Sequence, residues 1–243
     1  MTRGKYEARH PAVLAFLKWL DNSPHLQHLA WYQRFRAVIE LWFAAVRRDD
    51  PTYLKRVEEL TPEAVRGGKV PRIMEQEGAC THFAKLRQAM MEEPQDLLGE
   101  AYQAYSVRDT RSLAQYFTPD SVAKCMAAMS VGDLPEDVFR KPGGCKLSEP
   151  ACGSGVMMIH FLAEIHRKHG QWALNRTQVV MCDLDPLCVA MAGIQMAWMP
   201  WPMADVVLMQ GDSLTQKQEV VWVLGKGVPP AYERIVVKPE VQP

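Results

Sequence analysis

A short apolar segment that ends in an acidic residue and a Gly-X-Gly turn constrains the fold of this chain more than any other feature. Residues 147–155 read Leu-Ser-Glu-Pro-Ala-Cys-Gly-Ser-Gly, and a helix-forming run follows them. Glycine permits a tight turn and lets the backbone approach a ligand closely, so Gly153 and Gly155 suit a ligand-binding loop between a strand and a helix. The Glu149 carboxylate at the strand's end can accept hydrogen bonds from that ligand. A plain tight turn has the same spacing, so the surrounding sequence must decide between the two interpretations.

From about residue 112 onward, the sequence alternates between helical and extended patterns. Helices are expected over 119–129, 155–168 and 187–199, and strands over 146–150, 178–183 and 205–209. Strands that are separated by helices predict a parallel sheet with right-handed crossovers. Ligands of such sheets bind at the carboxyl ends of the strands. Three acidic residues fall at that edge, namely Glu149, Asp183 and Asp212.

The first hundred or so residues carry a helical pattern instead. Apolar positions three and four residues apart predict helices over about 11–20 and 26–48. We interpret this aromatic-rich block as a packed helical bundle. The expected organisation is therefore an α-helical N-terminal domain over residues 1–110 and an α/β domain over residues 111–243.

The composition is that of a neutral globular protein. The 28 basic and 28 acidic residues cancel, so any binding of nucleic acid depends on local clusters such as Arg108 and Arg111. The six cysteines form no Cys-X-X-Cys pair, and we expect reduced thiols and no metal site. The sequence has no apolar run of about twenty residues and no signal-peptide layout, so a cytoplasmic protein without a membrane span is expected.

Four motifs in a fixed order point to a known family. They are Ala-Gln-Tyr-Phe-Thr-Pro at residues 114–119, the acidic Gly-X-Gly segment at 149–155, Val-Val-Met-Cys-Asp-Leu-Asp-Pro at 179–186 and Gln-Gly-Asp-Ser-Leu at 210–214. Together with a helical lead-in, this set resembles the DNA adenine-N6 methyltransferases, most closely the modification subunits of type I restriction systems. The resemblance covers roughly residues 94–215, and for the helical block before them it implies a docking or DNA-facing module as the functional alternative.

The resemblance implies a fold, a cofactor and a cofactor site. The fold is a Rossmann-like class I methyltransferase sheet, incomplete in this chain, and the cofactor is S-adenosyl-L-methionine. The Phe-Thr-Pro segment of the family lines the methionine end of the cofactor, although Thr118 also suits the N-cap of a helix that starts at Pro119. The implied cofactor-binding residues are Phe117, Thr118, Glu149, Ala151, Gly153, Ser154, Gly155, Asp183, Leu184, Asp212 and Ser213.

Two of these acids have an implied role and a structural alternative. Asp183 occupies the place of the acid that accepts hydrogen bonds from the ribose hydroxyls, and the alternative is a helix-capping acid, a task better suited to Asp185 beside Pro186. Asp212 occupies the place of the acid that accepts from the adenine amino group, and the alternative is an ordinary turn acid.

The catalytic signature of the family is not intact. An Asn/Asp-Pro-Pro-Tyr/Phe motif at the end of the fourth strand accepts the protons of adenine N6, and its aromatic residue stacks on the flipped base. Here Pro229, Pro230 and Tyr232 occupy similar positions, and we take them as the degenerate catalytic motif. Val228 precedes the two prolines, and neither it nor Gly225, the other possible equivalent, has a side chain that accepts a hydrogen bond.

Two hypotheses about function follow. The first is a DNA adenine-N6 methyltransferase that acts on DNA with a partner, such as a specificity-type subunit, that supplies sequence recognition. The second is a pseudo-methyltransferase that holds S-adenosylmethionine or DNA in an assembly without transferring a methyl group. An open edge of the incomplete sheet also suits a homodimer. Methylation of protein or RNA on the same scaffold is a third possibility, because class I methyltransferases share these motifs across many substrates.

Overall fold

The computed structural model describes residues 8–49, 51–53, 55, 78–106, 117–202 and 205–225. The chain divides into two compact units, residues 1–117 and residues 118–243. The boundary predicted near residue 110 falls within residues 107–116, which lie outside the described residues.

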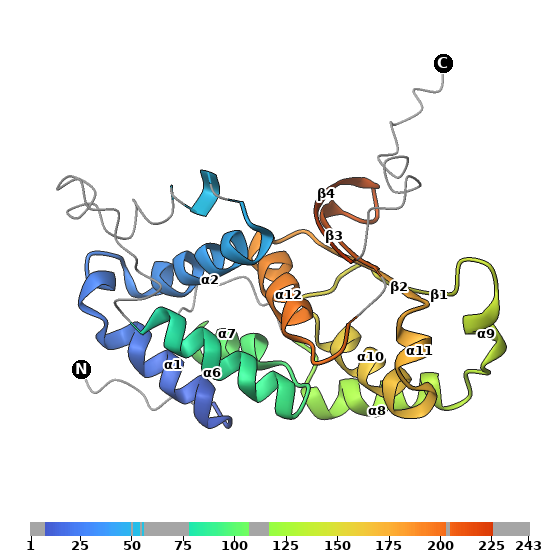
Figure 1. The fold of residues 1–243 in the computed structure, drawn as a ribbon. Helices are drawn as coiled ribbons and strands as arrows, with labels where there is room; N and C mark the ends of the chain where they lie inside the picture. The colour runs from blue at the N-terminus through green and yellow to red at the C-terminus, as the bar shows by residue number, and fades with distance from the viewer. Residues whose placement is uncertain are drawn as a thin grey trace, which may run out of the picture. The chain divides into compact units, whose positions relative to one another are not determined.

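Helices alone make up the described part of the first unit (Figure 1). They are α1 (Pro11–Asn22), the 3-10 helix η1 (Pro24–Leu26), α2 (Trp31–Arg47), α6 (Ala79–Glu92) and α7 (Leu97–Ser106). Their aromatic residues form a packed core, as interpreted from the sequence, and the rings of Phe16 and Trp42 lie 5.0 Å apart. Both side chains are fully buried, and burial of each contributes about 1.5–3 kcal/mol.

The second predicted helix begins later than expected, at Trp31 instead of residue 26. Pro24–Leu26 forms η1, and the Gln33 side chain then accepts a hydrogen bond from the Ala30 amide at 3.3 Å. That bond satisfies one of the backbone donors that a helix start leaves open, so it marks the true beginning of α2.

The second unit contains an α/β sheet whose predicted parallel strands are confirmed. The elements in chain order are α8 (Asp120–Gly132), α9 (Asp137–Arg140), β1 (Cys145–Glu149), α10 (Val156–His169), α11 (Gln171–Leu174), β2 (Thr177–Asp183), α12 (Pro186–Trp198), β3 (Asp205–Asp212) and β4 (Lys217–Gly225). The sheet order is β1-β2-β3-β4, and β1, β2 and β3 are parallel (Figure 1). The crossovers that the sequence predicted are α10 and α12.

Both faces of the sheet carry buried apolar side chains. Val179, Met181, Val206 and Leu208 are fully buried, and α12 contacts β2 and β3. Alternate residues of a strand point to opposite faces, so the residues between these belong to the other face. There Cys182, Val207 and Met209 form a second buried cluster. Among the described helices, none is long and apolar enough to cross a membrane.

The fourth strand corrects the expectation of a purely parallel sheet. β4 runs antiparallel to β3, and Gly225 pairs with Asp205 at the beginning of β3. The reason is the short connection after Asp212, since antiparallel strands can be joined by a hairpin whereas a parallel crossover needs a dozen or more residues. Gly225 therefore lies at the amino end of β3, about 23 Å from Asp212 at roughly 3.3 Å per residue.

Candidate cofactor site

The loop between β1 and α10 is tied to the end of β2. The Cys152 amide donates to the Cys182 carbonyl oxygen at 2.8 Å, and the Gly153 amide donates to Asp183 Oδ2, also at 2.8 Å. Since β1 and β2 are neighbouring parallel strands, these two bonds fix the Gly-X-Gly loop over their carboxyl ends. This is the edge at which the sequence predicts a ligand.

Asp183 has a structural task that the sequence did not reveal. Its Oδ2 accepts from Gly153 in the loop, and its Oδ1 accepts from the Asp185 amide at 2.9 Å. A carboxylate has about four lone-pair sites, so roughly two of them remain for a ligand. Helix capping falls to Asp185, as predicted, because its side chain accepts from the Leu187 amide at 2.9 Å and Pro186 starts α12.

The two glycines of the loop adopt backbone conformations that disfavour other residues. Gly153 has φ 52° and Gly155, the N-cap residue of α10, has φ 98°. A Cβ at Gly155 would also lie 3.1 Å from Met181 Cε and 3.4 Å from the Ala192 Cα. The second glycine is therefore required both by its φ angle and by the close approach of β2 and α12.

Replacing Gly155 with alanine should destabilise the chain by about 2 kcal/mol, because a strained backbone and a tight contact coincide there. Chemical denaturation measures the change, and Gly132→Ala is the matched control. Gly132 ends α8, has nothing within 4 Å of the position of its Cβ, and should lose no stability. An unchanged denaturation midpoint for Gly155→Ala would contradict the packing of the loop described here.

Glu149 ends β1 in a half-buried position. Burial raises the pKa of its carboxyl, the hydrogen bond from the Ala151 amide lowers it, and the charge of Asp183 raises it further. The charged form is therefore less favourable in the folded chain than in water, and this cost is present at any pH above the usual pKa of a glutamate. A cation placed beside this carboxylate would remove the penalty.

Asp212 forms the turn between β3 and β4. Its Oδ1 accepts from the Leu214 amide at 2.9 Å and from the Thr215 amide at 3.3 Å. The bonds from Thr215, backbone first, followed by the bond from Leu214, lower the pKa of the Asp212 carboxyl. The turn interpretation is confirmed, and a contact with adenine stays a prediction.

Two leucines near these acids are exposed, although large apolar side chains are usually buried. Leu184 follows Asp183 and is 71% exposed, and Leu214 follows Ser213 and is 93% exposed. They come from the loops after β2 and β3, at the carboxyl edge of the sheet.

The remaining predicted residues differ in their positions and contacts in the structure. Thr118 is not an N-cap, because α8 begins at Asp120 with Pro119 in the cap position, which makes no side-chain bond. Phe117 packs against Tyr102 in the first unit, with ring centroids 5.4 Å apart. Ala151 is exposed in the loop. Pro229, Pro230 and Tyr232 lie outside the described residues.

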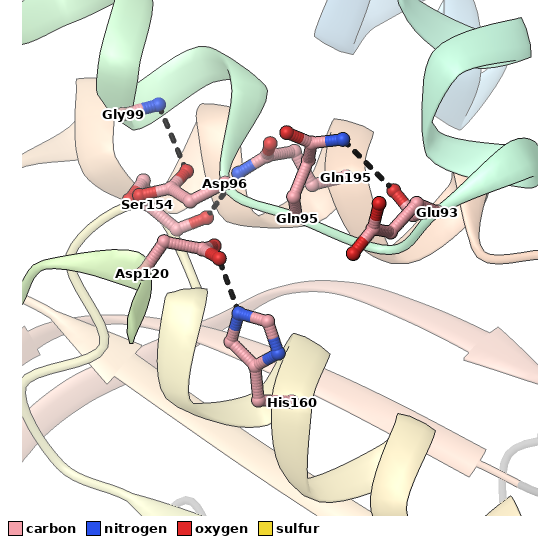
Figure 2. Close-up of polar contacts among 8 residues, drawn as sticks. All are labelled: Glu93, Gln95, Asp96, Gly99, Asp120, Ser154, His160 and Gln195. Carbon is pink, nitrogen blue, oxygen red and sulfur yellow. Dashed lines mark hydrogen bonds and ion pairs between the residues drawn. The ribbon is translucent and has the colours of Figure 1, made fainter. Parts of the chain in front are cut away.

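A buried glutamine that sequence reasoning missed anchors the loop on α12. Gln195 is fully buried, and its Nε2 donates to the Ser154 carbonyl oxygen at 2.8 Å (Figure 2). Ser154 is also fully buried, so it exposes no surface to a ligand in this structure. The signal in the sequence is a single amide in the apolar run 187–198, since a buried amide needs a hydrogen-bond partner.

One buried thiol lies in the loop, and two others lie on β2 and α12. Burial, with the charge of Asp183 as the next cause, raises the pKa of Cys152 well above its usual value. Cys182 is also buried, and Cys188 is buried on α12. Burial also raises the pKa of Cys182, so the Cys152 and Cys182 thiols are protonated and unreactive at neutral pH. In the part of the chain that the structure describes, no group of His, Cys, Asp or Glu could hold a metal ion.

Three parallel strands, β1, β2 and β3, with a glycine loop and acidic residues at their carboxyl ends are the arrangement of a Rossmann-like ligand-binding domain. A family model described as N-6 DNA methylase matches residues 93–236, which is more than half of the 243 residues. The chain belongs to this family of DNA methylases. Its second unit has a Rossmann-like α/β arrangement, of which the described residues form the sheet β1-β2-β3-β4.

The search of solved structures found a protein of Listeria monocytogenes assigned to the class I S-adenosylmethionine-dependent methyltransferases. It shares 17% sequence identity with a TM-score of 0.37, and the match covers 74% of this chain and 54% of that one. The chain thus spans about half the length of that protein. The search of curated proteins found no match.

Proposed function

We propose that the chain binds S-adenosylmethionine at the carboxyl edge of β1, β2 and β3 and acts in the methylation of adenine in DNA. The observation that carries the proposal is the bond between the Gly153 amide and Asp183 Oδ2, because it joins the glycine loop and the acidic strand end into one site. Membership of the N-6 DNA methylase family supports DNA as the substrate.

The chemistry of the residues at this edge fits the cofactor. S-adenosylmethionine supplies an electrophilic methyl group on a sulfonium, and it also carries an ammonium group, a ribose diol and an adenine ring. Glu149, whose pKa is raised by burial, gains from a cationic group beside it. Asp183 retains lone pairs for the ribose hydroxyls. The exposed Leu184 and Leu214 side chains can cover the faces or the rim of an adenine ring.

The type I resemblance supports a protein partner. In the proposed assembly a specificity-type subunit recognises the DNA sequence, and this chain presents the cofactor. The balance of 28 basic and 28 acidic residues supports the same division, because a neutral chain gains little affinity from phosphate contacts. A second copy of the chain is the other proposed partner.

A second candidate function is cofactor binding without methyl transfer. Two observations favour it. Gly225 pairs with Asp205 and so lies at the opposite edge of the sheet from Glu149 and Asp183, which removes it as the equivalent of the family's acceptor. Val228, the residue before Pro229 and Pro230, has no acceptor atom in its side chain. Adenine N6 must lose a proton to become methylated. A chain without an acceptor there would therefore bind the cofactor but transfer no methyl group.

Val228→Asn separates the two candidates. If the acceptor has been lost, the unmodified chain transfers no labelled methyl group to DNA, and the asparagine variant raises transfer to a detectable level. Val228→Leu is the matched control, because it changes the size of the side chain without adding an acceptor. Strong methylation by the unmodified chain would contradict the second candidate, and a silent asparagine variant that still binds the cofactor would show that Val228 is not the missing acceptor.

A further inference from the structure

A buried histidine links the beginnings of two neighbouring helices. His160 lies on α10, and its Nε2 is 2.8 Å from Oδ1 of Asp120, the first residue of α8 (Figure 2). The His160 side chain is 5% exposed, whereas that of Asp120 is 45% exposed. A buried imidazole needs a hydrogen-bond partner, and the carboxylate supplies it. The negative charge in the first turn is also favourable for the dipole of α8.

A second polar link joins the same helices at their other ends. Lys168 Nζ donates to the Val131 carbonyl oxygen at 3.2 Å and also to that of Gly132. Because Asp120 pairs with His160 and Val131 with Lys168, α8 and α10 run side by side in the same direction. Both links connect α8 to α10. The Asp120–His160 link lies nearer to the glycine loop than the Lys168 link does.

The first link is the one close to the proposed cofactor site. His160 follows Gly155 by five residues, so it lies about one turn into the helix that leaves the loop. Asp120 follows Thr118 by two residues, and the Pro119 carbonyl oxygen accepts from the Val122 and Ala123 amides in the first turn of α8. The pair thus connects the Thr-Pro segment to the N-terminal end of α10, which is the end that joins the glycine loop.

We propose that His160 and Asp120 are positioning residues of the cofactor site, which hold Thr118 in place relative to the loop at Gly153–Gly155. The assignment rests on the proposed binding of S-adenosylmethionine. Neither residue has to touch the cofactor for this purpose. A purely structural link would instead stabilise the unit without any particular effect on ligand affinity, as expected of Lys168.

The test compares cofactor affinity and stability across four variants of the full chain. Asp120→Ala breaks the link at its exposed partner, and His160→Leu breaks it at its buried one. Asp120→Asn keeps an acceptor oxygen, and Lys168→Met removes the link at the far end. Calorimetric titration with S-adenosylmethionine gives Kd, thermal unfolding gives Tm, and hydrogen exchange of the Val122 and Ala123 amides reports the order of the first turn of α8.

We expect Asp120→Ala and His160→Leu to weaken binding about tenfold, the loss expected for one hydrogen bond to a charged group, and to speed exchange at both amides. Asp120→Asn should restore affinity to within about twofold, and Lys168→Met should lower Tm while Kd stays within about twofold. Unchanged affinity in a folded Asp120→Ala, or an equal loss in Lys168→Met, would overturn the positioning role alone. A folded, unmodified chain that binds no cofactor would overturn the proposed function and this assignment together.

Discussion

Replacement of Asp183 with alanine should weaken the binding of S-adenosylmethionine by roughly 100-fold. The change removes the acceptor for the Gly153 and Asp185 amides, at 2.8 and 2.9 Å, and the proposed acceptor for the ribose. Hydrogen bonds to a charged group contribute about 1.5–3 kcal/mol each, and a net loss of about 3 kcal/mol corresponds to this factor. Calorimetric titration measures the change in Kd.

The neighbouring acid provides the control for this prediction. Asp185→Ala removes the N-cap of α12, which should cost about 1 kcal/mol of stability and leave cofactor affinity nearly unchanged. Asp183→Asn retains one carbonyl oxygen, and its affinity for the cofactor should fall between those of Asp183→Ala and Asp185→Ala. If Asp183→Ala bound the cofactor as tightly as the unmodified chain, the site would have to lie elsewhere.

Gly211→Ala should destabilise the chain strongly. Gly211 has φ 142°, and a Cβ there would lie 2.2 Å from the Lys217 carbonyl oxygen and 2.6 Å from the Gln218 Cα. Backbone cannot move aside as a flexible side chain can, so β3 and β4 must separate where Gly211 pairs with Gln218. The expected loss is about 3 kcal/mol or more, measured as a fall in Tm.

At Gln216 in the same turn, replacement by glycine should cause no loss of stability. It has φ 57°, a conformation that costs a residue with a side chain about 1–2 kcal/mol and costs glycine nothing. Gln216→Gly should therefore leave Tm unchanged or raise it slightly.

A Gly211→Ala variant that unfolds at the temperature of the unmodified chain would show that the hairpin is built differently.

The sequence predicted those parts of the fold that local patterns determine. Alternating helices and strands predicted β1, β2, β3 and the helices between them, because strand residues alternate faces and helix residues repeat every three or four positions. The acidic strand ends and the Gly-X-Gly loop were also predicted from local sequence, because each lies where the pattern of a strand ends. Asp185 as the cap of α12 followed from the proline beside it.

Contacts between distant residues could not be predicted in this way. Nothing near Asp183 in the sequence indicates that Gly153, 30 positions away, donates to it. The bond of Gln195 to Ser154 spans 41 positions of the sequence. The direction of β4 depends on the length of the turn after Asp212, which becomes clear only from the pairing of the strands. An N-cap role was the structural alternative for Thr118 because its side chain suits one, but Pro119 holds that position.

Titration of the unmodified chain with S-adenosylmethionine in a calorimeter tests the central claim most directly, with S-adenosylhomocysteine as the comparison. The account predicts one site per chain with a Kd on the order of micromolar. It also predicts measurable binding of the demethylated product, because the parts that we propose Asp183 and the loop to contact are shared by both molecules. A folded chain that releases no heat with either ligand would contradict the account, since the site at the carboxyl edge of the sheet would then hold no cofactor.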